Sequence, residues 1–588
     1  MQNAKCYLKG YPRPQFVRNN WGLLDGEWSF SFDDNDIGEK QRWFQSDKLL
    51  NKIIVPFAYQ TLKSEVNDNT YHKIMWYTKK QLFEIKDNER IILNFEGVDY
   101  FAKLWVNGIF IGEHKGGYCR FSFDITNAIS DKKETIITLR VEDDNDCCKP
   151  RGKQTWLNHP FGCWYLPTSG IWKSVWFEKV NLTHIKRIKM TPKEDNYHVE
   201  FEYDIDNFKE GYYLQTVVEF NNKIIADDKL KLIRKNHTYD IDFTNDLEGF
   251  KIHWWTIENP LFYDIKFYLY DNNNKLVDEV GSYFGFRFFK AEKNHLTLNL
   301  NPVYLRLVLN QGYFRNSGLT GSEEELLNDI LYCKELGFNG IRMHQKIEDE
   351  RFYYLCDMLG MFVFCEMPSS YEFKDNSIDN VTSEWMEVVK QNYNHQSIVV
   401  WVPINESWGV NQLTSSSRQR HFTQTLYHLT KSYDPFRPVI SNDGWEQTYS
   451  DIVTFHNYAQ DYKDLKHFYE DIKGVLDGEN RNDYTQLRIP FVGNTKYNGQ
   501  PILIDEFAGI GYQNKDDEGW GYGDKVSSEE LYVKRLSSLI KVIREMDYIC
   551  GFCVTQLTDT YQEINGLMDF DRNYKANKEE LRKAIIQK

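Results

Sequence analysis

The sequence has few of the features that mark membrane, secreted and nucleic-acid-binding proteins. Its 588 residues contain no run of about 18 apolar residues, the length that a membrane-spanning helix needs. The opening residues MQNAKCYLKGYPRP include no apolar segment of the kind found in secretory signals. Positive charge is also scarce: the net charge is −15, which argues against nucleic acid or an anionic membrane as a partner.

Cysteine is present but not in a disulfide pattern. The 10 cysteines show no regular spacing, which favours reduced thiols and a cytoplasmic location. Cys550 and Cys553 form a C-x-x-C motif inside YICGFCVTQ, a segment with the composition of a strand. Residues three apart in a strand point to opposite faces, so this motif does not predict a redox or metal site.

Aromatic residues are abundant, and the first half of the chain favours β-structure. Aromatics make up 16% of the residues; their faces stack on sugar rings, but they also fill the cores of β-sandwiches. Residues 1–180 contain short alternating runs broken by Gly, Asn and Asp, which predict a jelly-roll β-sandwich. Within it, Asn107 and Gly108 predict a hairpin turn. Residues 181–290 have the length and alternation of one immunoglobulin-like β-sandwich.

A dense aromatic segment closes the first of these domains. The stretch PRGKQTWLNHPFGCWYLPTSGIWKSVWFEKV holds Arg151, Trp156, Trp164, Tyr165 and Trp172. These side chains fit either packing against the next domain or contact with a sugar, and the sequence leaves both interpretations open.

The pattern changes in residues 291–588, where apolar strands alternate with amphipathic helices. One helical segment is SEEELLNDILYCKELG, in which Ser322 and Glu325 have the spacing of a capping box. Eight β-α units over this length predict a (β/α)8 TIM barrel, whose active site lies at the C-terminal ends of the strands. The predicted strands are 304–310, 338–344, 361–367, 398–405, 437–443, 452–458, 501–507 and 549–556.

The polar residues that end these strands are the candidates for the active site. They are rich in carboxylates: Asn310, Arg342, His344, Glu366, Asn405, Glu406, Asp443, His456, Tyr458, Asp505, Glu506 and Gln556. Two carboxyl groups across a cleft are what glycoside hydrolysis requires, one protonated for the leaving oxygen and one ionised. Ion pairing with Arg or Lys of the barrel is the alternative role, and it suits Glu366 best. Because adjacent strand residues point to opposite faces, we expect only Glu506 of the pair Asp505-Glu506 to face the cleft.

Several of these strand segments resemble those of a known protein family. VWVPINESWG and PILIDEFAG resemble the fourth and seventh barrel strands of glycoside hydrolase family 2, the group of β-galactosidases, β-glucuronidases and β-mannosidases. LRLVLNQGYF and GFNGIRMH are similar to its first two barrel strands. YPRPQ and GIWKSVWFE are similar to parts of its sugar-binding domain, and SYFGFR to the end of its immunoglobulin-like domain.

The resemblance implies a retaining exo-glycosidase that hydrolyses terminal β-glycosides through a covalent glycosyl-enzyme intermediate. It implies that Glu406 is the acid/base and Glu506 the nucleophile. Asn405 matches the amide that binds the sugar 2-hydroxyl. The other substrate-binding residues that it implies are Tyr458, His344, Arg342, Asp443 and Trp445.

Two departures from the family pattern bear on metal and substrate. The loop after the third strand reads CEMPSSYEF and lacks the His that ligates metal in large β-galactosidases, so we expect neither a catalytic metal nor another cofactor. After the eighth strand, Asp559 and Glu563 stand where β-glucuronidases carry an Asn-x-Lys motif for the uronate. Acidic groups repel a carboxylate, so we expect a neutral sugar and favour a β-galactoside.

Several alternatives stay open. The enzyme could be a β-glucuronidase or another exo-glycosidase of the family, and the chain could instead be a carbohydrate-binding protein without activity. The resemblance also makes a homo-oligomer an expectation, although no interface is evident in the sequence.

Overall fold

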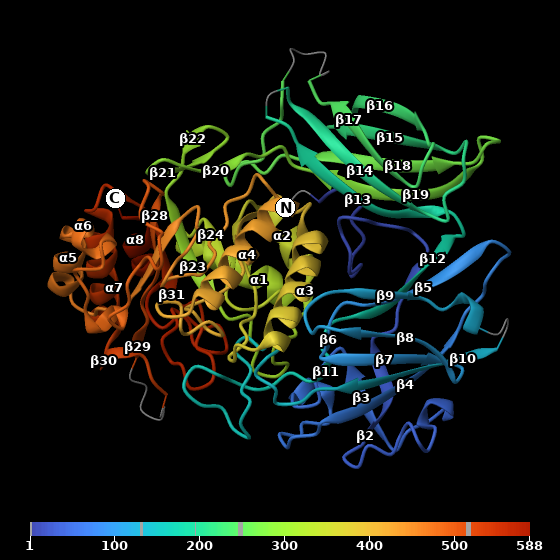
Figure 1. Ribbon diagram of the computed structural model, residues 1–588, viewed down its shortest axis with the longest axis horizontal. Helices are drawn as coiled ribbons and strands as arrows, with labels where there is room; N and C mark the ends of the chain where they lie inside the picture. Colours follow the sequence, from blue (N-terminus) through green and yellow to red (C-terminus); the bar gives the residue numbers. More distant parts are fainter. Residues whose placement is uncertain (1–2, 130–132, 195, 245–250, 513–518, 588) are drawn as a thin grey trace.

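A computed structural model of the chain describes residues 3–129, 133–194, 196–244, 251–512 and 519–587. It contains two β-sandwiches followed by a barrel of parallel strands surrounded by helices. In Figure 1 the first sandwich (blue) and the second (green) lie on one side of the barrel (yellow to red). The predicted fold class is therefore confirmed.

The first sandwich pairs a six-stranded antiparallel sheet with a four-stranded one. Their inward faces form one apolar core that includes Trp28, Tyr77 and Leu93. The larger sheet has the order β3 (Asn51–Val55), β2 (Gly26–Phe32), β4 (Ile74–Leu82), β10 (Glu134–Glu142), β7 (Phe101–Val106), β8 (Ile109–Lys115). The smaller has the order β1 (Trp21–Leu23), β12 (Val175–Asn181), β5 (Glu89–Phe95), β9 (Phe121–Asp124), and β6 (Val98–Asp99) pairs with β11 (Gly170–Ile171).

The predicted hairpin joins β7 to β8. Asn107 and Gly108 have φ of 49° and 76°, and the flanking Val106 and Ile109 are paired across the strands. Two consecutive positive φ angles match the right-handed twist of a hairpin, and Asn and Gly are the residues that adopt them at least cost.

The second sandwich shows the alternation of a sheet with one covered face. Every second residue of β14 and of β15 is buried, as expected when side chains point alternately inward and outward. Its two antiparallel sheets have the orders β13 (His184–Pro192), β14 (His198–Asp206), β17 (Asn236–Asp242) and β16 (Lys223–Lys231), β15 (Tyr213–Phe220), β18 (Tyr263–Tyr270), β19 (Leu276–Phe284). A short meander of β20 (Phe289–Glu292), β21 (His295–Leu298) and β22 (Asn301–Pro302) leads into the barrel.

The barrel contains a seven-stranded parallel sheet within the described residues. Its order is β26 (Ile398–Val402), β25 (Phe362–Glu366), β24 (Gly340–Met343), β23 (Leu305–Asn310), β31 (Ile549–Thr555), β28 (Ile502–Ala508), β27 (Val453–Asn457). The helices are α1 (Glu323–Leu336), α2 (Glu350–Leu359), α3 (Asp375–Asn392), α4 (Ser417–Tyr433), α5 (Tyr462–Glu470), α6 (Ile472–Leu476), α7 (Glu529–Arg544) and α8 (Lys578–Ile586). Beyond β28, β29 (Ile510–Tyr512) pairs with β30 (Tyr522–Val526). Helix α1 begins with the predicted capping box of Ser322 and Glu325.

The prediction of a fifth strand over 437–443 is wrong in form, although the segment occupies the expected place. It makes two isolated parallel bridges in place of a continuous ladder, Val439 to Trp401 of β26 and Asp443 to Asn405 just beyond β26. Pro438 has no N–H to donate, and the N–H of Val439 bonds to the Asp451 side chain at 2.9 Å. The segment therefore takes the place of a barrel strand between β26 and β27, but its backbone is irregular.

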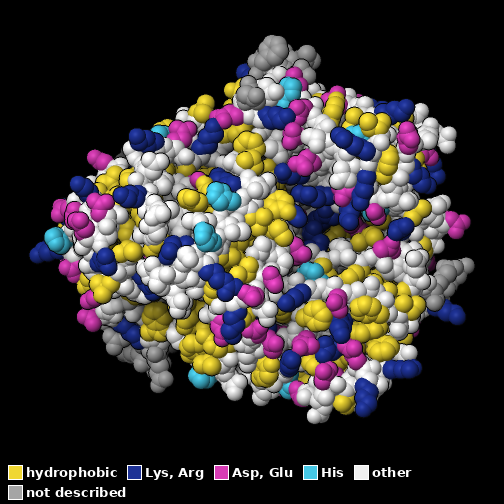
Figure 2. All heavy atoms as spheres, in the orientation of Figure 1, with side chains coloured by type: hydrophobic (Ala, Val, Ile, Leu, Met, Phe, Trp, Pro, Cys, Tyr) yellow, Lys and Arg dark blue, Asp and Glu magenta, His cyan; other side chains and the backbone are white. Residues whose placement is uncertain are grey.

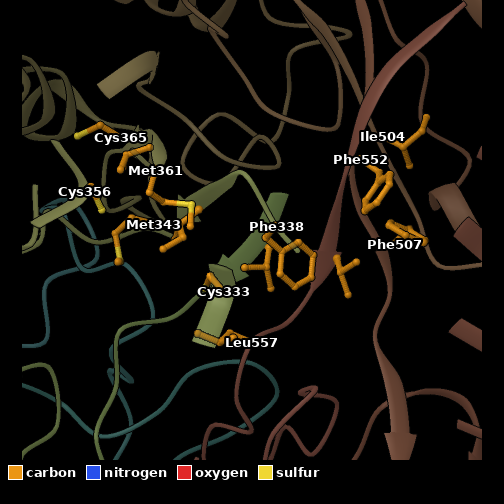
Figure 3. Close-up of a cluster of buried hydrophobic side chains, with 14 of the residues drawn as sticks. Cys333, Phe338, Met343, Cys356, Met361, Cys365, Ile504, Phe507, Phe552 and Leu557 are labelled. Carbon is orange, nitrogen blue, oxygen red and sulfur yellow. The ribbon is translucent and has the colours of Figure 1, made fainter. Parts of the chain in front are cut away.

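The barrel strands are buried on both faces, which explains their unbroken apolar sequences. All five residues of β25 and of β26 are buried. Figure 3 shows part of the core between strands and helices, where Met343, Cys356 and Cys365 lie on one side and Ile504, Phe507 and Phe552 on the other. All ten cysteine thiols are free.

The surface mixes charges of both signs. On the face drawn in Figure 2, Lys and Arg side chains are interspersed with Asp and Glu over all three domains. Within the described residues no helix combines the length and the apolar character needed to cross a membrane.

Candidate active site

A buried arginine organises the C-terminal mouth of the barrel. Arg342, at the end of β24, is fully buried. Its guanidinium donates to Glu366 at 2.8 Å, to Glu506 at 2.6 Å and to Asn405 at 2.7 Å. Its Nε also lies 2.9 Å from Asp443 Oδ2. Because the N–H donors of a guanidinium have fixed positions, Arg342 holds side chains from four segments of the barrel in one arrangement.

Glu506 is surrounded by groups that favour its ionised form. Burial by itself would raise the pKa of this carboxyl, but His456, Arg342, His344 and a hydrogen bond from Tyr458 outweigh it and hold the pKa below the ordinary value of 4.5. The Tyr458 hydroxyl donates to Glu506 Oε2, and its ring stacks on Tyr522 at 3.4 Å between centroids. Glu506 is therefore a fixed carboxylate at the barrel mouth.

Glu406 lies on a strained turn just beyond β26. Glu406 and the following Ser407 have φ of 50° and 54°, a left-handed backbone conformation that residues other than Gly rarely adopt. The turn is held from outside, because the Glu406 N–H bonds to the Asp443 carbonyl at 2.9 Å and the Ser407 N–H to Asn442 at 2.8 Å. Its carboxylate lies 2.8 Å from His456 Nδ1 and accepts a hydrogen bond from the Trp408 indole at 3.2 Å.

The two predicted carboxylates are brought together across the mouth. One oxygen of Glu406, one of Glu506 and a ring nitrogen of His456 all lie within 4.8 Å of one another. The Glu406 side chain is 14% exposed and the Glu506 side chain 6%, so Glu406 is the more accessible of the two.

The same three groups have the donor atoms of a metal site, but their present partners argue against one. His456 Nδ1 is already engaged by Glu406 at 2.8 Å. The Arg342 guanidinium lies 2.6 Å from Glu506, and its charge would repel a second cation. A metal would thus have to displace interactions that hold the site together. Activity without a metal remains a prediction.

The two histidines of the site have opposite electrostatic environments. Burial, opposed by Glu366 and reinforced by Lys153, lowers the pKa of His344. For His456 burial is outweighed by Glu506 and Glu406, which raise its pKa. His344 Nδ1 is 2.9 Å from Glu366 and 3.9 Å from Glu506, so this histidine lies between these two carboxylates.

The remaining predicted residues lie around this centre. Asn405 is fully buried, and its Nδ2 has no hydrogen-bond partner in the described part of the chain. Asp443 is fully buried against Arg342 and does not itself reach the surface. Trp445 is 6% exposed, with the Arg488 guanidinium 3.9 Å above its ring and Trp408 at 5.8 Å. Glu366 is a structural partner of Arg342 and His344.

Strict alternation of side chains, the reason for expecting only Glu506 and not Asp505 to face the cleft, does not hold at this pair. Both approach Arg342: Glu506 at 2.6 Å and the Asp505 carboxylate at 3.9 Å. The pairing of β28 with β31 shifts register between Ile504 and Phe507, and such a bulge cancels the strict alternation. Only Glu506 reaches the mouth, since Asp505 is fully buried and its pKa is raised well above normal by burial and by Asp443.

The loop after β31 is less acidic in effect than its sequence indicates. Lys575 pairs with Asp559 and also donates to the Ile564 carbonyl at 2.9 Å. Glu563 is buried, and burial raises its pKa to about 7 against the opposing charge of Lys153. The Gln556 amide donates to Glu563 at 3.2 Å. Lys575 belongs to Asn573-Tyr574-Lys575, which has the letters of the Asn-x-Lys motif but a different place in the sequence pattern, and the structure pairs it with Asp559.

Three residues of the site were given no role from the sequence. His456 was one of the polar residues predicted to end a barrel strand, the sixth, and this position is the feature of the sequence that indicates a role in the site. Trp408 lies two residues after Glu406 in the same motif. Lys153 comes from the first sandwich, and no local signal marks it. Residues 150–169 extend from that sandwich along the barrel (teal in Figure 1).

Comparisons with known proteins agree with this architecture. Residues 22–179 match the sugar binding domain of glycosyl hydrolases family 2, and residues 183–287 match a second domain of that family. Residues 289–510 match the family's TIM barrel domain. The chain belongs to glycoside hydrolase family 2.

Relatives with similar sequences include proteins named beta-glucuronidase and proteins named beta-galactosidase. A putative beta-glucuronidase of Formosa agariphila is 27% identical over 67% of this chain and 47% of its own length. A beta-galactosidase of Thermoanaerobacterium thermosulfurigenes is 26% identical over 74% of this chain and 60% of its own. The chain thus spans about half the length of these relatives.

Solved structures show the same fold. The b-glucuronidase from Ruminococcus gnavus in complex with uronic deoxynojirimycin superposes with a TM-score of 0.79 at 17% identity, covering 98% of this chain and all of the other. The putative beta-galactosidase from Bacteroides fragilis has a TM-score of 0.76 at 18% identity, covering 97% of this chain and 86% of the other. At these identities the likeness concerns the fold alone.

Proposed function

We propose that the protein is a retaining β-glycosidase that removes the terminal sugar from a β-glycoside. The observation that carries this proposal is the spacing of Glu406 and Glu506, whose oxygens come within 4.8 Å. Retaining glycosidases hold their two carboxyl groups about 5 Å apart, whereas inverting enzymes leave room for a water between them. The spacing therefore favours direct attack by one carboxylate.

The environments of the two carboxyls divide their roles. Glu506, held ionised by Arg342 and His456, attacks the anomeric carbon and forms a glycosyl ester as the bond to the leaving oxygen breaks. Glu406 gives its proton to that oxygen. In the second step Glu406 takes a proton from water, the water oxygen bonds to the anomeric carbon, and Glu506 leaves as a carboxylate.

The surrounding polar groups suit the binding of the sugar in this reaction. The unpartnered Nδ2 of Asn405 is free to donate to the 2-hydroxyl, a contact that strengthens as charge develops on the ring. Tyr458 fixes Glu506 from the side opposite Arg342 and so orients the attacking oxygen. Arg342, Asp443 and Glu366 act through these residues, because all three are fully buried.

For the sugar itself we propose a neutral β-glycoside, with β-galactoside as the first choice. Glu563 lies in the loop after β31, close enough to Glu506 for the two charges to influence each other. A substrate carboxylate would add a third negative charge to this part of the pocket. The family includes relatives named beta-galactosidase, which is consistent with the choice.

One observation favours β-glucuronidase as the second candidate. Lys153 is buried, and although burial lowers its pKa, Cys163, Glu563 and Glu406 outweigh burial and raise it, so its ammonium lies near enough to these groups to interact with them. In the described residues no carboxylate lies within ion-pair distance, 4.0 Å, of its ammonium. Such a cation could accept the carboxylate of a uronic acid.

A panel of nitrophenyl β-glycosides separates the candidates. We expect kcat/KM for the galactoside to exceed that for the glucuronide, and the first-formed sugar to keep the β configuration in a proton NMR time course. If the glucuronide is preferred, Lys153→Met should abolish that preference while sparing neutral substrates. An α-configured first product would refute the retaining mechanism, and the absence of turnover on every glycoside would favour a carbohydrate-binding protein.

A further inference from the structure

Five aromatic side chains meet beside Glu406, and they come from two domains. Trp156, Phe161 and Trp164 belong to the first sandwich, while Tyr371 and Trp408 belong to the barrel; together they are called the aromatic wall. None of the five is fully buried or fully exposed. Partly exposed aromatic rings that gather at a catalytic mouth present an apolar face to whatever enters it.

The rings of the aromatic wall touch in a continuous series. Trp164 lies 5.3 Å from Trp408 and 4.9 Å from Phe161 between ring centroids. Trp156 lies 4.7 Å from Tyr371, and Tyr371 lies 5.6 Å from Trp408. The wall therefore extends from the catalytic turn of the barrel to the loop of the sandwich without a break.

The sandwich segment is clamped onto the barrel at both of its ends. The Gly162 carbonyl accepts hydrogen bonds from Trp520 and from Gln562, each at 2.9 Å. The N–H groups of Arg151 and Gly152 donate to the Ser369 carbonyl at 2.9 and 3.1 Å. This anchoring fixes the rings before any ligand arrives, which lowers the entropic cost of binding.

The position of Glu406 indicates which part of a substrate would meet the wall. Trp408 donates its indole N–H to Glu406 Oε2 at 3.2 Å, so the wall begins at the carboxyl group that protonates the leaving oxygen. A general acid must lie within hydrogen-bond reach of the oxygen it protonates. The group attached to that oxygen is therefore next to Trp408 and its neighbours.

We propose that the aromatic wall is the binding subsite for the leaving group of the glycoside, and that it takes a flat apolar face. Both an aryl ring and the C–H face of a second sugar have this chemistry. The inference rests on the proposed glycosidase function and adds that the first sandwich supplies half of the subsite. Under this proposal Trp156 and Trp164 have both of the roles that the sequence left open, because they pack on Tyr371 and Trp408 of the barrel and would also contact the leaving group.

The test compares leaving groups of different size on the same sugar. A β-glycosyl fluoride has a leaving group of one atom, which does not reach the wall and departs without a proton from Glu406. We expect Trp164→Ala to lower kcat/KM for the nitrophenyl glycoside and for a β-linked disaccharide by about 10-fold, the effect of losing one good stacking contact. Turnover of the fluoride should stay within about 2-fold of the wild-type value.

Two controls separate loss of the subsite from damage to the fold. Leu157 lies on the same segment and is 43% exposed, so Leu157→Ala should leave all three substrates unaffected. Trp164→Phe keeps a ring and should restore most of the activity on the two larger substrates. An acceptor alcohol with an aryl ring should also capture less of the glycosyl-enzyme in Trp164→Ala, because the same subsite receives the acceptor in the second step.

The outcomes distinguish the two proposals. If wild-type protein turns over neither the fluoride nor the nitrophenyl glycosides, the glycosidase function fails. If wild-type protein is active and Trp164→Ala affects the fluoride as much as the disaccharide, or affects none of them, the subsite is refuted. Among substrates that Trp164→Ala impairs, a larger loss for the disaccharide than for the aryl glycoside identifies a sugar as the natural leaving group, and the reverse identifies an aryl group.

Discussion

The mouth of the barrel and the core of the second sandwich are equally well buried but are built from opposite materials. In the sandwich, β14 and β15 bury every second residue, nearly all of them apolar, and the core consists of side chains such as Val218, Ile265 and Phe267. In the barrel mouth, Arg342, Glu366 and other charged groups have no exposed surface at all. One region therefore buries apolar surface, and the other buries charge.

The difference shows what each region contributes. Burial of apolar side chains stabilises a fold without further conditions. Burial of charges costs free energy that their mutual attraction repays only when the geometry is right, so a buried ionic network is a weak source of stability. Under the proposed function, the network around Arg342 serves to hold Glu506 and Asn405 in a fixed geometry. Changes in the mouth should affect activity most, and changes in the sandwich core should affect only stability.

The largest effect should come from Glu506→Gln, which removes the attacking carboxylate while preserving the shape of the side chain. We expect kcat/KM to fall by on the order of 10⁴-fold or more on every substrate, as when a nucleophile is removed from other enzymes. Asp505→Asn is the matched control and should keep much of the activity, because Asp505 is fully buried and does not reach the mouth of the barrel. Comparable losses in both variants would show that the neighbouring carboxyls have been assigned wrongly.

The next effect concerns stability and compares the two regions directly. Arg342→Met should leave Glu366, Asp443 and Glu506 buried without their cation and cost about 3–5 kcal/mol in the free energy of unfolding. Ile265→Val in the sandwich core should cost only about 1 kcal/mol and leave kcat/KM unchanged. Calorimetric unfolding and steady-state kinetics of both variants test this. Equal destabilisation by the two changes would show that the buried charges of the mouth and the apolar core of the sandwich do not differ in this way.

Glu406→Ala should have a smaller effect, and one that depends on the leaving group. Loss of general acid catalysis costs about 10²–10⁴-fold when the leaving group is poor, whereas an activated aryl glycoside should still form the glycosyl-enzyme. Added azide should then yield a β-glycosyl azide, because azide attacks without needing a general base. Azide rescue in Glu506→Ala and not in Glu406→Ala would reverse the two roles.

A still smaller effect is expected from pH at the contact between the barrel and the first sandwich. Glu384 of α3 accepts the Tyr118 N–H at 2.7 Å, and burial raises its pKa to about 8. The folded protein therefore keeps a proton that the unfolded chain loses above its ordinary value of 4.5. This contribution to stability is complete below that value and is lost as the pH rises towards about 8.

Glu384→Gln tests this interpretation, because the amide cannot titrate. The melting temperature of wild-type protein should fall from pH 5 to pH 9 by more than that of the variant. Ile265→Val serves as the control and should parallel the wild type over the same range. Identical pH profiles of wild type and Glu384→Gln would mean that Glu384 does not control the stability of this contact.

The smallest expected effect is that of a chelator, which should leave activity intact. The groups Glu406, His456 and Glu506 are close enough to hold a cation, but Arg342 and Tyr458 already satisfy Glu506. Activity before and after treatment with EDTA, with magnesium added back, is the measurement. Loss and recovery would show that the charged mouth is organised around a metal.

The sequence by itself determined the features that depend on neighbouring residues. Alternation predicted the strands of both sandwiches, Asn107-Gly108 the hairpin, and Ser322 with Glu325 the start of α1. The apolar runs that end in polar residues placed Glu406 and Glu506 at one end of the barrel, because parallel strands share an edge. These signals act over a few residues, and so they survive without knowledge of the rest of the fold.

Only the tertiary structure decided what depends on contacts between distant segments. The bond from Arg342 to Glu506 joins residues 164 positions apart, and the bond from Trp520 to Gly162 joins residues 358 apart. Three other features arise in the same way: the bulge that turns Asp505 toward Arg342, the irregular backbone of residues 437–443, and the position of Lys153 near the mouth of the barrel. Such contacts form when distant segments of one domain, or two whole domains, pack against one another, and no periodicity within a single segment encodes which residues will meet.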